Sequence, residues 1–163
     1  MMKNNTVITR DTANRKVNVT RDFEAPIEKV WKAWTDPVLL DKWWAPKPWK
    51  AVTKTMDFRA GGLWLYYMAG PEGEKMYNRA DFITVEPGVG FTSDCRFCDE
   101  DGNADPNFPV MHWNVIFKGT PTGTHVDVTL SFDDDAGFEK ILKMGFEGGF
   151  TMGLNNLDEL LEA

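Results

Sequence analysis

The sequence is poor in the features that mark several common functional classes. Its 163 residues include only two cysteines and two histidines, and no stretch approaches the ~20 apolar residues of a membrane span. The chain has a formal net charge of -7 and no Lys/Arg cluster, which argues against non-specific binding to nucleic acid or anionic membranes. The N-terminus has no apolar run of secretory length. We therefore expect a cytoplasmic protein with no nucleic-acid partner and no membrane insertion.

The short motifs of common catalytic and cofactor sites are also missing. The chain has no G-x-S-x-G elbow, no P-loop and no dinucleotide fingerprint. Cys95 and Cys98 have redox-type spacing, but they fall in a predicted strand and not at a helix N-terminus, so we interpret them as small buried hydrophobic residues. The acidic loop 99–105 has Ala104 and Val110 where a calcium loop needs Gly and Glu. We expect no metal, no cofactor and no catalytic residue set.

Aromatic residues, by contrast, are abundant. They make up 13% of the chain, with seven Trp and eleven Phe, and each such side chain buries roughly 150–250 Å². The core should therefore be large for a chain that is long enough for one ordinary domain. We expect a single domain over residues 16–163. Residues 1–15 are polar and predict a flexible N-terminal segment, with a short ordered piece around Val7–Thr9.

The predicted elements begin with a strand and two short helices. Apolar and polar residues alternate over 16–23, which predicts a half-buried strand, and Arg21 interrupts the apolar series as a residue at a sheet edge would. Pro26 fits the first turn of a helix. Asp36 and Pro37 then supply the N-cap and first position of a second helix.

Six further strands and a long C-terminal helix complete the pattern. The strands fall between residues 49 and 132, and an apolar stripe with helical spacing runs from Phe138 to Leu161. Four glycines within that stripe predict a kink or a place where the sheet and the helix approach closely. The β-α-α-β6-α order predicts an α+β fold in which a curved antiparallel sheet wraps around the long helix over an apolar cavity.

One hairpin can be predicted down to its register. Pairing Phe117 with Val126 and Val115 with Val128 places both apolar sets on the same side of the sheet. Both histidines then belong to the polar set that faces water, and they do not oppose each other. We therefore expect no metal site or catalytic dyad from them.

The aromatic set allows two interpretations. It is either plain core or, in part, the lining of a ligand pocket, since small-molecule sites are mostly apolar with few polar groups. Tyr66, Asn78 and Asp94 could supply polar groups if they point inward. Our candidate cavity-lining residues are Trp64, Tyr66, Met68, Asn78, Phe82, Trp113, Val115, Phe138, Phe146 and Phe150.

An ordered series of short motifs resembles a known family. The series is Arg21-x-Phe23-x-Ala25-Pro26-x-x-x-Val30-Trp31, Thr35-Asp36-Pro37, Trp43-Trp44-x-Pro46, Asp57-x-Arg59-x-Gly61-Gly62, Pro71-x-Gly73, Glu86-Pro87 and Gly123-Thr124-x-Val126. It is similar to the Bet v 1-like/START (SRPBCC) superfamily, and within it to bacterial stand-alone domains of the Hsp90-ATPase-activator C-terminal type. The resemblance covers about residues 16 to 163.

The resemblance implies a helix-grip fold with a hydrophobic cavity between the sheet and the long helix. Members of the superfamily bind lipids, hormones or polyketides, catalyse cyclisation, or act as co-chaperones. The final helix of relatives usually carries a Gly-Trp pair, and Gly149-Phe150 stands in that place here. Phenylalanine removes an indole N–H donor.

Three functional hypotheses follow. The first is a domain that holds an apolar or amphipathic molecule, such as a hydrophobic small molecule or lipid. The second is a protein-interaction module of the Hsp90 co-chaperone type, which predicts an exposed apolar patch around Trp43–Trp49 and no sizeable cavity. The third is a cyclase-like enzyme, which needs inward-facing Asp, His, Arg or Tyr side chains that converge in the pocket. Its candidates are Tyr66, Asn78, Asp94 and Arg96. A homodimer is left open.

Overall fold

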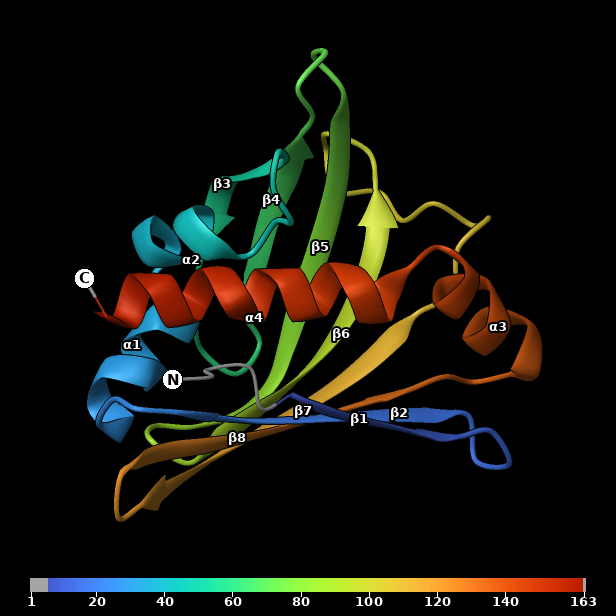
Figure 1. Cartoon of the computed structure of the whole chain (residues 1–163). Helices are drawn as coiled ribbons and strands as arrows, with labels where there is room; N and C mark the ends of the chain where they lie inside the picture. The colour runs from blue at the N-terminus through green and yellow to red at the C-terminus, as the bar shows by residue number, and fades with distance from the viewer. Residues whose placement is uncertain (1–5, 163) are drawn as a thin grey trace.

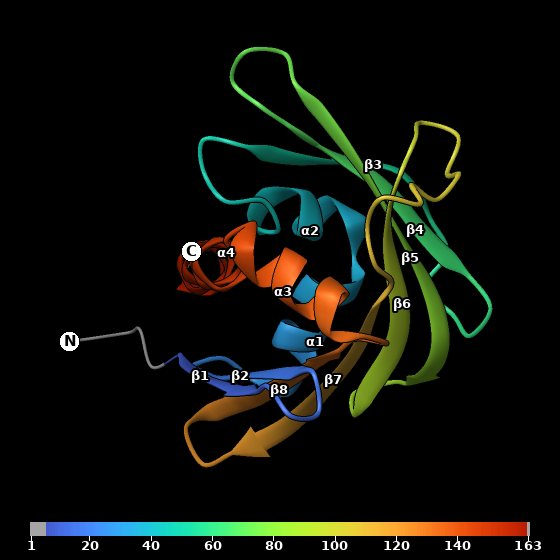
Figure 2. The same ribbon diagram turned by 90° about the vertical axis from the view of Figure 1, so that its right-hand side faces the viewer.

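In the computed structural model, which describes residues 6–162, one curved antiparallel sheet wraps around the helices (Figures 1 and 2). The elements are β1 (Val7–Asp11), β2 (Lys16–Phe23), α1 (Ile27–Thr35), α2 (Pro37–Trp43), β3 (Lys50–Met56), β4 (Leu63–Ala69), β5 (Lys75–Glu86), β6 (Gly90–Cys98), β7 (Met111–Thr120), β8 (Gly123–Ser131), α3 (Asp135–Lys143) and α4 (Phe146–Glu162). The strand order is β1-β2-β8-β7-β6-β5-β4-β3. Figure 1 shows α4 lying across the concave face. The predicted α+β helix-grip fold is confirmed.

Local signals explain where the helices begin. The Asp36 side chain accepts a hydrogen bond from the Val38 backbone N–H at 2.9 Å, and Pro37 occupies the first turn of α2. Asp134 caps α3 in the same way, accepting from the backbone N–H of Gly137 at 2.7 Å. Each cap satisfies a backbone donor that has no partner within the helix.

The sheet has one strand more than predicted. Strand β1 pairs along its whole length with β2, with Ile8 opposite Val19, so the sheet begins before residue 16. The pairing lies where the sequence indicated only a short ordered piece around Val7–Thr9. Of the rest of the predicted flexible segment, Thr6 precedes β1, residues 12–15 form the β1–β2 turn, and residues 1–5 lie outside the described residues.

Two glycines of the C-terminal apolar stripe, Gly145 and Gly153, affect the helices in different ways. The stripe is broken at Gly145, whose φ of 89° suits glycine, and this break separates α3 from α4. At Gly153 a Cβ atom would lie 3.2 Å from the carbonyl oxygen of Trp44. The predicted kink is therefore confirmed as a full break, and the close approach is to the chain after α2, not to the sheet.

The β7–β8 register matches the prediction. Phe117 pairs with Val126 and Val115 with Val128, and all four side chains are buried. Burial of one face explains why the register could be predicted, because a one-residue slip would expose the whole apolar set.

The prediction that Arg21 lies at a sheet edge is wrong. Its side chain is 2% exposed on the concave side of β2, in phase with Val17, Val19 and Phe23, and does not lie at an edge. Its guanidinium donates to Asp158 at 2.7 Å and to Asn155 at 2.6 Å, both on α4. The charge interrupts the apolar series because it pairs with the helix that covers the sheet.

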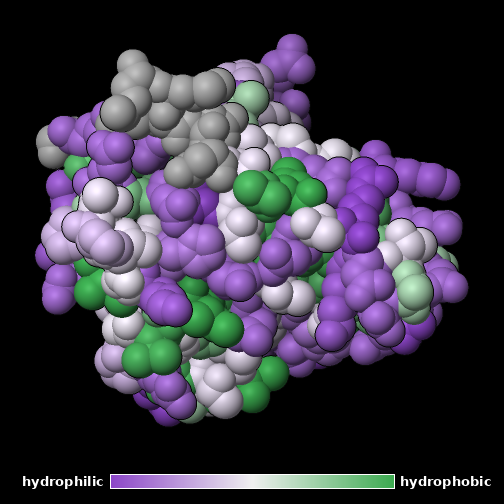
Figure 3. All heavy atoms as spheres, turned by 60° about the horizontal axis from the view of Figure 1, so that its bottom comes forward, coloured by the Kyte–Doolittle hydropathy of each residue, from purple (hydrophilic) through white to green (hydrophobic). Residues whose placement is uncertain are grey.

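The surface is mostly polar on the face shown in Figure 3, with hydrophobic residues in separate spots. None of the helices within residues 6–162 combines the length and the apolar character needed to cross a membrane.

Candidate ligand-binding cavity

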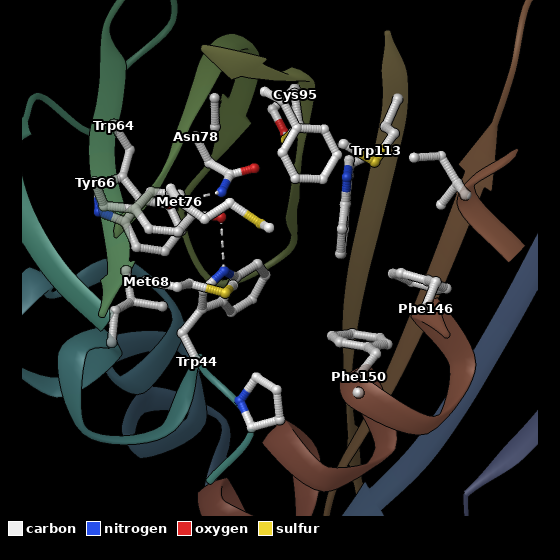
Figure 4. A pocket seen from close by; sticks show the side chains of 18 of the residues that line it. Trp44, Trp64, Tyr66, Met68, Met76, Asn78, Cys95, Trp113, Phe146 and Phe150 are labelled. Atoms are coloured by element: carbon white, nitrogen blue, oxygen red, sulfur yellow. Dashed lines mark hydrogen bonds between the residues drawn. The ribbon is translucent and has the colours of Figure 1, made fainter. Parts of the chain in front are cut away.

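An apolar cavity of about 220 Å³ lies between the concave face of β4–β7 and the α3–α4 helices (Figure 4). The chain after α2 closes it from a third side through Trp44 and Pro46. Met144, Gly145 and Phe146 line it, which places it at the α3 end of α4. The fold therefore leaves space beside its core.

The wall of the cavity is made of neutral side chains, ten of them aromatic and five of them methionines. The lining residues are Trp34, Leu40, Trp44, Pro46, Met56, Trp64, Tyr66, Met68, Met76, Asn78, Ala80, Phe82, Phe91, Ser93, Cys95, Phe97, Met111, Trp113, Ile141, Met144, Gly145, Phe146, Gly149 and Phe150. A charged ligand group would lose its hydration there without gaining an opposite charge.

Eight of the ten predicted lining residues lie on this wall, namely Trp64, Tyr66, Met68, Asn78, Phe82, Trp113, Phe146 and Phe150. Val115 and Phe138 do not. Val115 is fully buried in the core between Phe91 and Val128 of the neighbouring strands. Phe138 packs edge-on against Phe132, with ring centroids 5.8 Å apart. Both residues are apolar, as cavity-lining residues usually are, but they lie in the packed core.

Sequence reasoning missed most of the methionines. Met56, Met76, Met111 and Met144 line the cavity, yet methionine carries no periodic signal that separates a wall from a core. The β5 phase was also uncertain from sequence. A register shift between Phe82 and Thr84 explains why, since it reverses the alternation within the strand.

Two methionines mark the mouth of the cavity. Met76 and Met144 both line it, and they are 41% and 46% exposed. Met76 lies near the start of β5 and Met144 in the α3–α4 connection, so the opening lies between the sheet rim and the helix break. Unbranched thioether side chains can move aside at such an opening more easily than branched ones.

The aromatic side chains pack in fixed pairs around the space. Trp64 stacks on Tyr66 with centroids 3.9 Å apart, and Phe146 stacks on Phe150 at 5.4 Å. Trp113 meets Phe150 edge-on at 5.5 Å. The cavity thus has stacked pairs on opposite sides, contributed by the sheet and by α4 (Figure 4).

A few polar groups interrupt the apolar wall. Trp44 Nε1 donates to the Tyr66 hydroxyl at 2.9 Å, and the Asn78 amide nitrogen lies 3.4 Å from the carbonyl oxygen of Met76. Burial raises the pKa of Tyr66 and raises the pKa of Cys95 to about 12. Both groups therefore stay protonated at neutral pH.

The other polar candidates lie on the outside of the sheet. Asp94 bonds to His112 Nδ1 at 2.7 Å, and Arg96 lies 3.4 Å from Asp81. Alternation along β6 accounts for this, because Ser93 and Cys95 on either side of Asp94 occupy the inward positions. The four side chains of the cyclase hypothesis therefore do not converge.

Hydrogen bonds within the acidic loop hold its conformation. The Asp99 carboxylate accepts hydrogen bonds from the backbone N–H groups of Asp101 and Asn103, both at 2.9 Å. These bonds, chiefly those to Asn103, lower the pKa of Asp99. Its charge stabilises the loop conformation.

His112 gives a pH-dependent prediction. Partial burial lowers the pKa of His112, but hydrogen bonds to Asp94 and Asp133 outweigh it, so the pKa lies above its ordinary value of about 6.5. A raised pKa in the folded state stabilises the fold below pH ~6.5, and this stabilisation is lost as pH rises through the folded pKa. We expect His112→Gln to reduce the free energy of unfolding more at pH 6 than at pH 8.5.

Urea unfolding of both proteins across this range checks the prediction. Taking the difference between them cancels the titration of the other groups. A difference that stays constant from pH 6 to 8.5 would contradict the assignment.

Solved structures of similar proteins have the same overall fold. The chain is similar to protein Ms6760 from Mycobacterium smegmatis, with 29% identity, a TM-score of 0.89 and 96% of each chain covered. A solution structure from Arthrobacter aurescens has 29% identity and a TM-score of 0.91 over 96% of this chain and 91% of its own. Protein NE0264 from Nitrosomonas europaea has 28% identity and a TM-score of 0.80 over 94% and 98%.

No curated protein matches the chain. The model of one family, however, matches residues 24–162, which include α1 to α4 and every strand except β1 and β2. On this match the chain belongs to the family described as Activator of Hsp90 ATPase homolog 1-like protein.

Proposed function

We propose that this protein binds a small apolar or amphipathic molecule in the cavity between its sheet and its C-terminal helices. The observation that carries the proposal is an apolar space of about 220 Å³ whose wall has no charged side chain and whose mouth opens between Met76 and Met144. Ligand sites typically combine such a wall with a few polar groups.

The size and neutrality of the cavity narrow the ligand class. Pockets for drug-sized ligands have volumes of roughly 300–1,000 Å³, so this space suits a compact molecule better than a long-chain lipid. A buried carboxylate or ammonium group would meet no opposite charge on the wall. The proposed ligand is therefore compact and neutral.

The co-chaperone alternative has less support. It predicted an exposed apolar patch around Trp43–Trp49 and no sizeable cavity. Instead, Trp43 is 1% exposed and donates to the carbonyl oxygen of Ala33 at 2.9 Å, while Trp44 lines the cavity. Trp43 and Trp44 therefore contribute to the interior and not to an exposed patch, which favours a small molecule over a protein as the binding partner.

We also propose that the protein works in the cytoplasm. Cys95 and Cys98 are both free thiols, which suits a reducing compartment.

Native mass spectrometry and calorimetry with four probes test the binding function. The probes are naphthalene, palmitate, benzylammonium and 1-naphthoate. We expect a one-to-one complex with naphthalene, and affinities for the three charged probes about tenfold weaker or less, because each would bury an unpaired charge. No complex with naphthalene, or equal binding of all four probes, would rule out the proposal.

A further inference from the structure

Tyr66 and Asn78 form a polar pair in a largely apolar wall. They are direct partners across β4 and β5, so both side chains project from the same concave face. Figure 4 shows them side by side above Trp44. The Tyr66 ring packs in the core, but within residues 6–162 neither polar group takes part in an ion pair, so the polarity of the two groups needs another explanation.

The orientation of the Asn78 amide follows from its neighbour. The Met76 carbonyl oxygen can only accept a hydrogen bond, so the amide group 3.4 Å from it must be the NH₂. The Asn78 carbonyl oxygen consequently turns toward the middle of the cavity (Figure 4). The residue is only 6% exposed, and within residues 6–162 nothing donates a hydrogen bond to this oxygen. An acceptor that faces the cavity without a protein partner is available to a donor on a ligand.

Tyr66 supplies the complementary group. Its oxygen accepts from Trp44 Nε1 at 2.9 Å, which leaves the hydroxyl proton to donate elsewhere. Burial raises the pKa of this phenol, so the proton is present at any physiological pH. No acceptor for it exists within the described part of the chain. One unused donor and one unused acceptor thus lie next to each other on the wall.

We propose that the ligand is a neutral aromatic alcohol of one or two rings, whose hydroxyl group donates to the Asn78 carbonyl oxygen and accepts from the Tyr66 hydroxyl. A hydroxyl is the smallest neutral group that does both. The aromatic part follows from the stacked pairs Trp64–Tyr66 and Phe146–Phe150, which offer ring faces on two sides of the space. This inference rests on the proposed binding function and specifies its chemistry.

Three naphthalene derivatives of similar shape test the inference by calorimetry on the whole chain. They are 2-naphthol, which donates and accepts, 2-methoxynaphthalene, which only accepts, and naphthalene, which does neither. We expect the wild type to prefer 2-naphthol over naphthalene by about tenfold or more, because a site built around a hydroxyl penalises ligands that leave its polar groups unpaired. 2-Methoxynaphthalene should lose most of that preference.

Two variants locate the recognition. In Asn78→Leu, and separately in Tyr66→Phe, the preference for 2-naphthol should fall to about threefold or less, whereas Gly148→Leu, on the outer side of α4, should keep it. Equal wild-type affinities for naphthalene and 2-naphthol would overturn the inference while leaving an apolar binding site intact. A preference that survives both variants would also overturn it. Failure of naphthalene itself to bind would instead refute the binding function.

Discussion

Replacing Arg21 with methionine is expected to lower the free energy of unfolding by about 3–5 kcal/mol, because the buried Asp158 carboxylate would lose its partner. Arg21 lies 2.7 Å from Asp158 and also holds Asn155, so it ties β2 to α4. For a protein of this size the loss corresponds to roughly 6–20 °C in melting temperature. Thermal and urea unfolding measure it.

The matched control removes both charges. In the double variant Arg21→Met, Asp158→Leu no charge is left buried and unpaired, so most of the lost stability should return. If the single variant cost less than about 1 kcal/mol, the ion pair would behave like an exposed one and our account of Arg21 would be wrong.

Replacing Gly149 with leucine is expected to weaken naphthalene binding by about tenfold or more without destabilising the fold. Gly149 lines the cavity, and a Cβ there would have only Pro46 Cγ nearby, at 3.9 Å. A longer side chain would therefore extend into the ligand space. Leucine also favours a helix over glycine by up to ~1 kcal/mol, so stability should stay the same or rise.

Gly148 offers a matched control on the same helix. A Cβ at Gly148 would have no neighbour within 4 Å, and the residue is exposed. Gly148→Leu therefore gains the same helix propensity but adds nothing to the cavity, so naphthalene affinity should change less than about twofold. Calorimetry and thermal unfolding of both variants make the comparison. Equal affinities in the two variants would show that naphthalene does not occupy this cavity.

Short-range patterns explain which parts of the fold could be predicted. The β7–β8 register followed from two alternating apolar sets, and the start of α2 from the Asp36-Pro37 pair. Strand β1 was missed because its side chains are largely exposed at the sheet edge and carry no apolar alternation. Arg21 was misplaced because its partner lies 137 residues further along the chain. Local periodicity contains no information about such a partner.

The sequence predicted the apolar, aromatic character of the candidate site better than it predicted which residues line it. The aromatic surplus indicated a cavity, and most of the nominated residues do lie on its wall. Val115 and Phe138 were included because the sequence pattern of an apolar residue does not distinguish a core position from a position that lines a cavity. The register shift in β5 hid the inward phase of Met76 and Asn78. Only the three-dimensional structure shows that the Asn78 oxygen is left without a donor.

Methionine methyl groups give the most direct test of the central claim that this cavity is a ligand site. Of the eight methionines in the chain, Met56, Met68, Met76, Met111 and Met144 line the cavity, while Met152 lies on α4 outside its wall and is largely exposed. In a chain labelled with ¹³C at the methionine methyls, titration with naphthalene should shift the five cavity signals by ring currents and leave Met152 unchanged. Shifts confined to Met152, or no shifts at saturating naphthalene, would contradict the account.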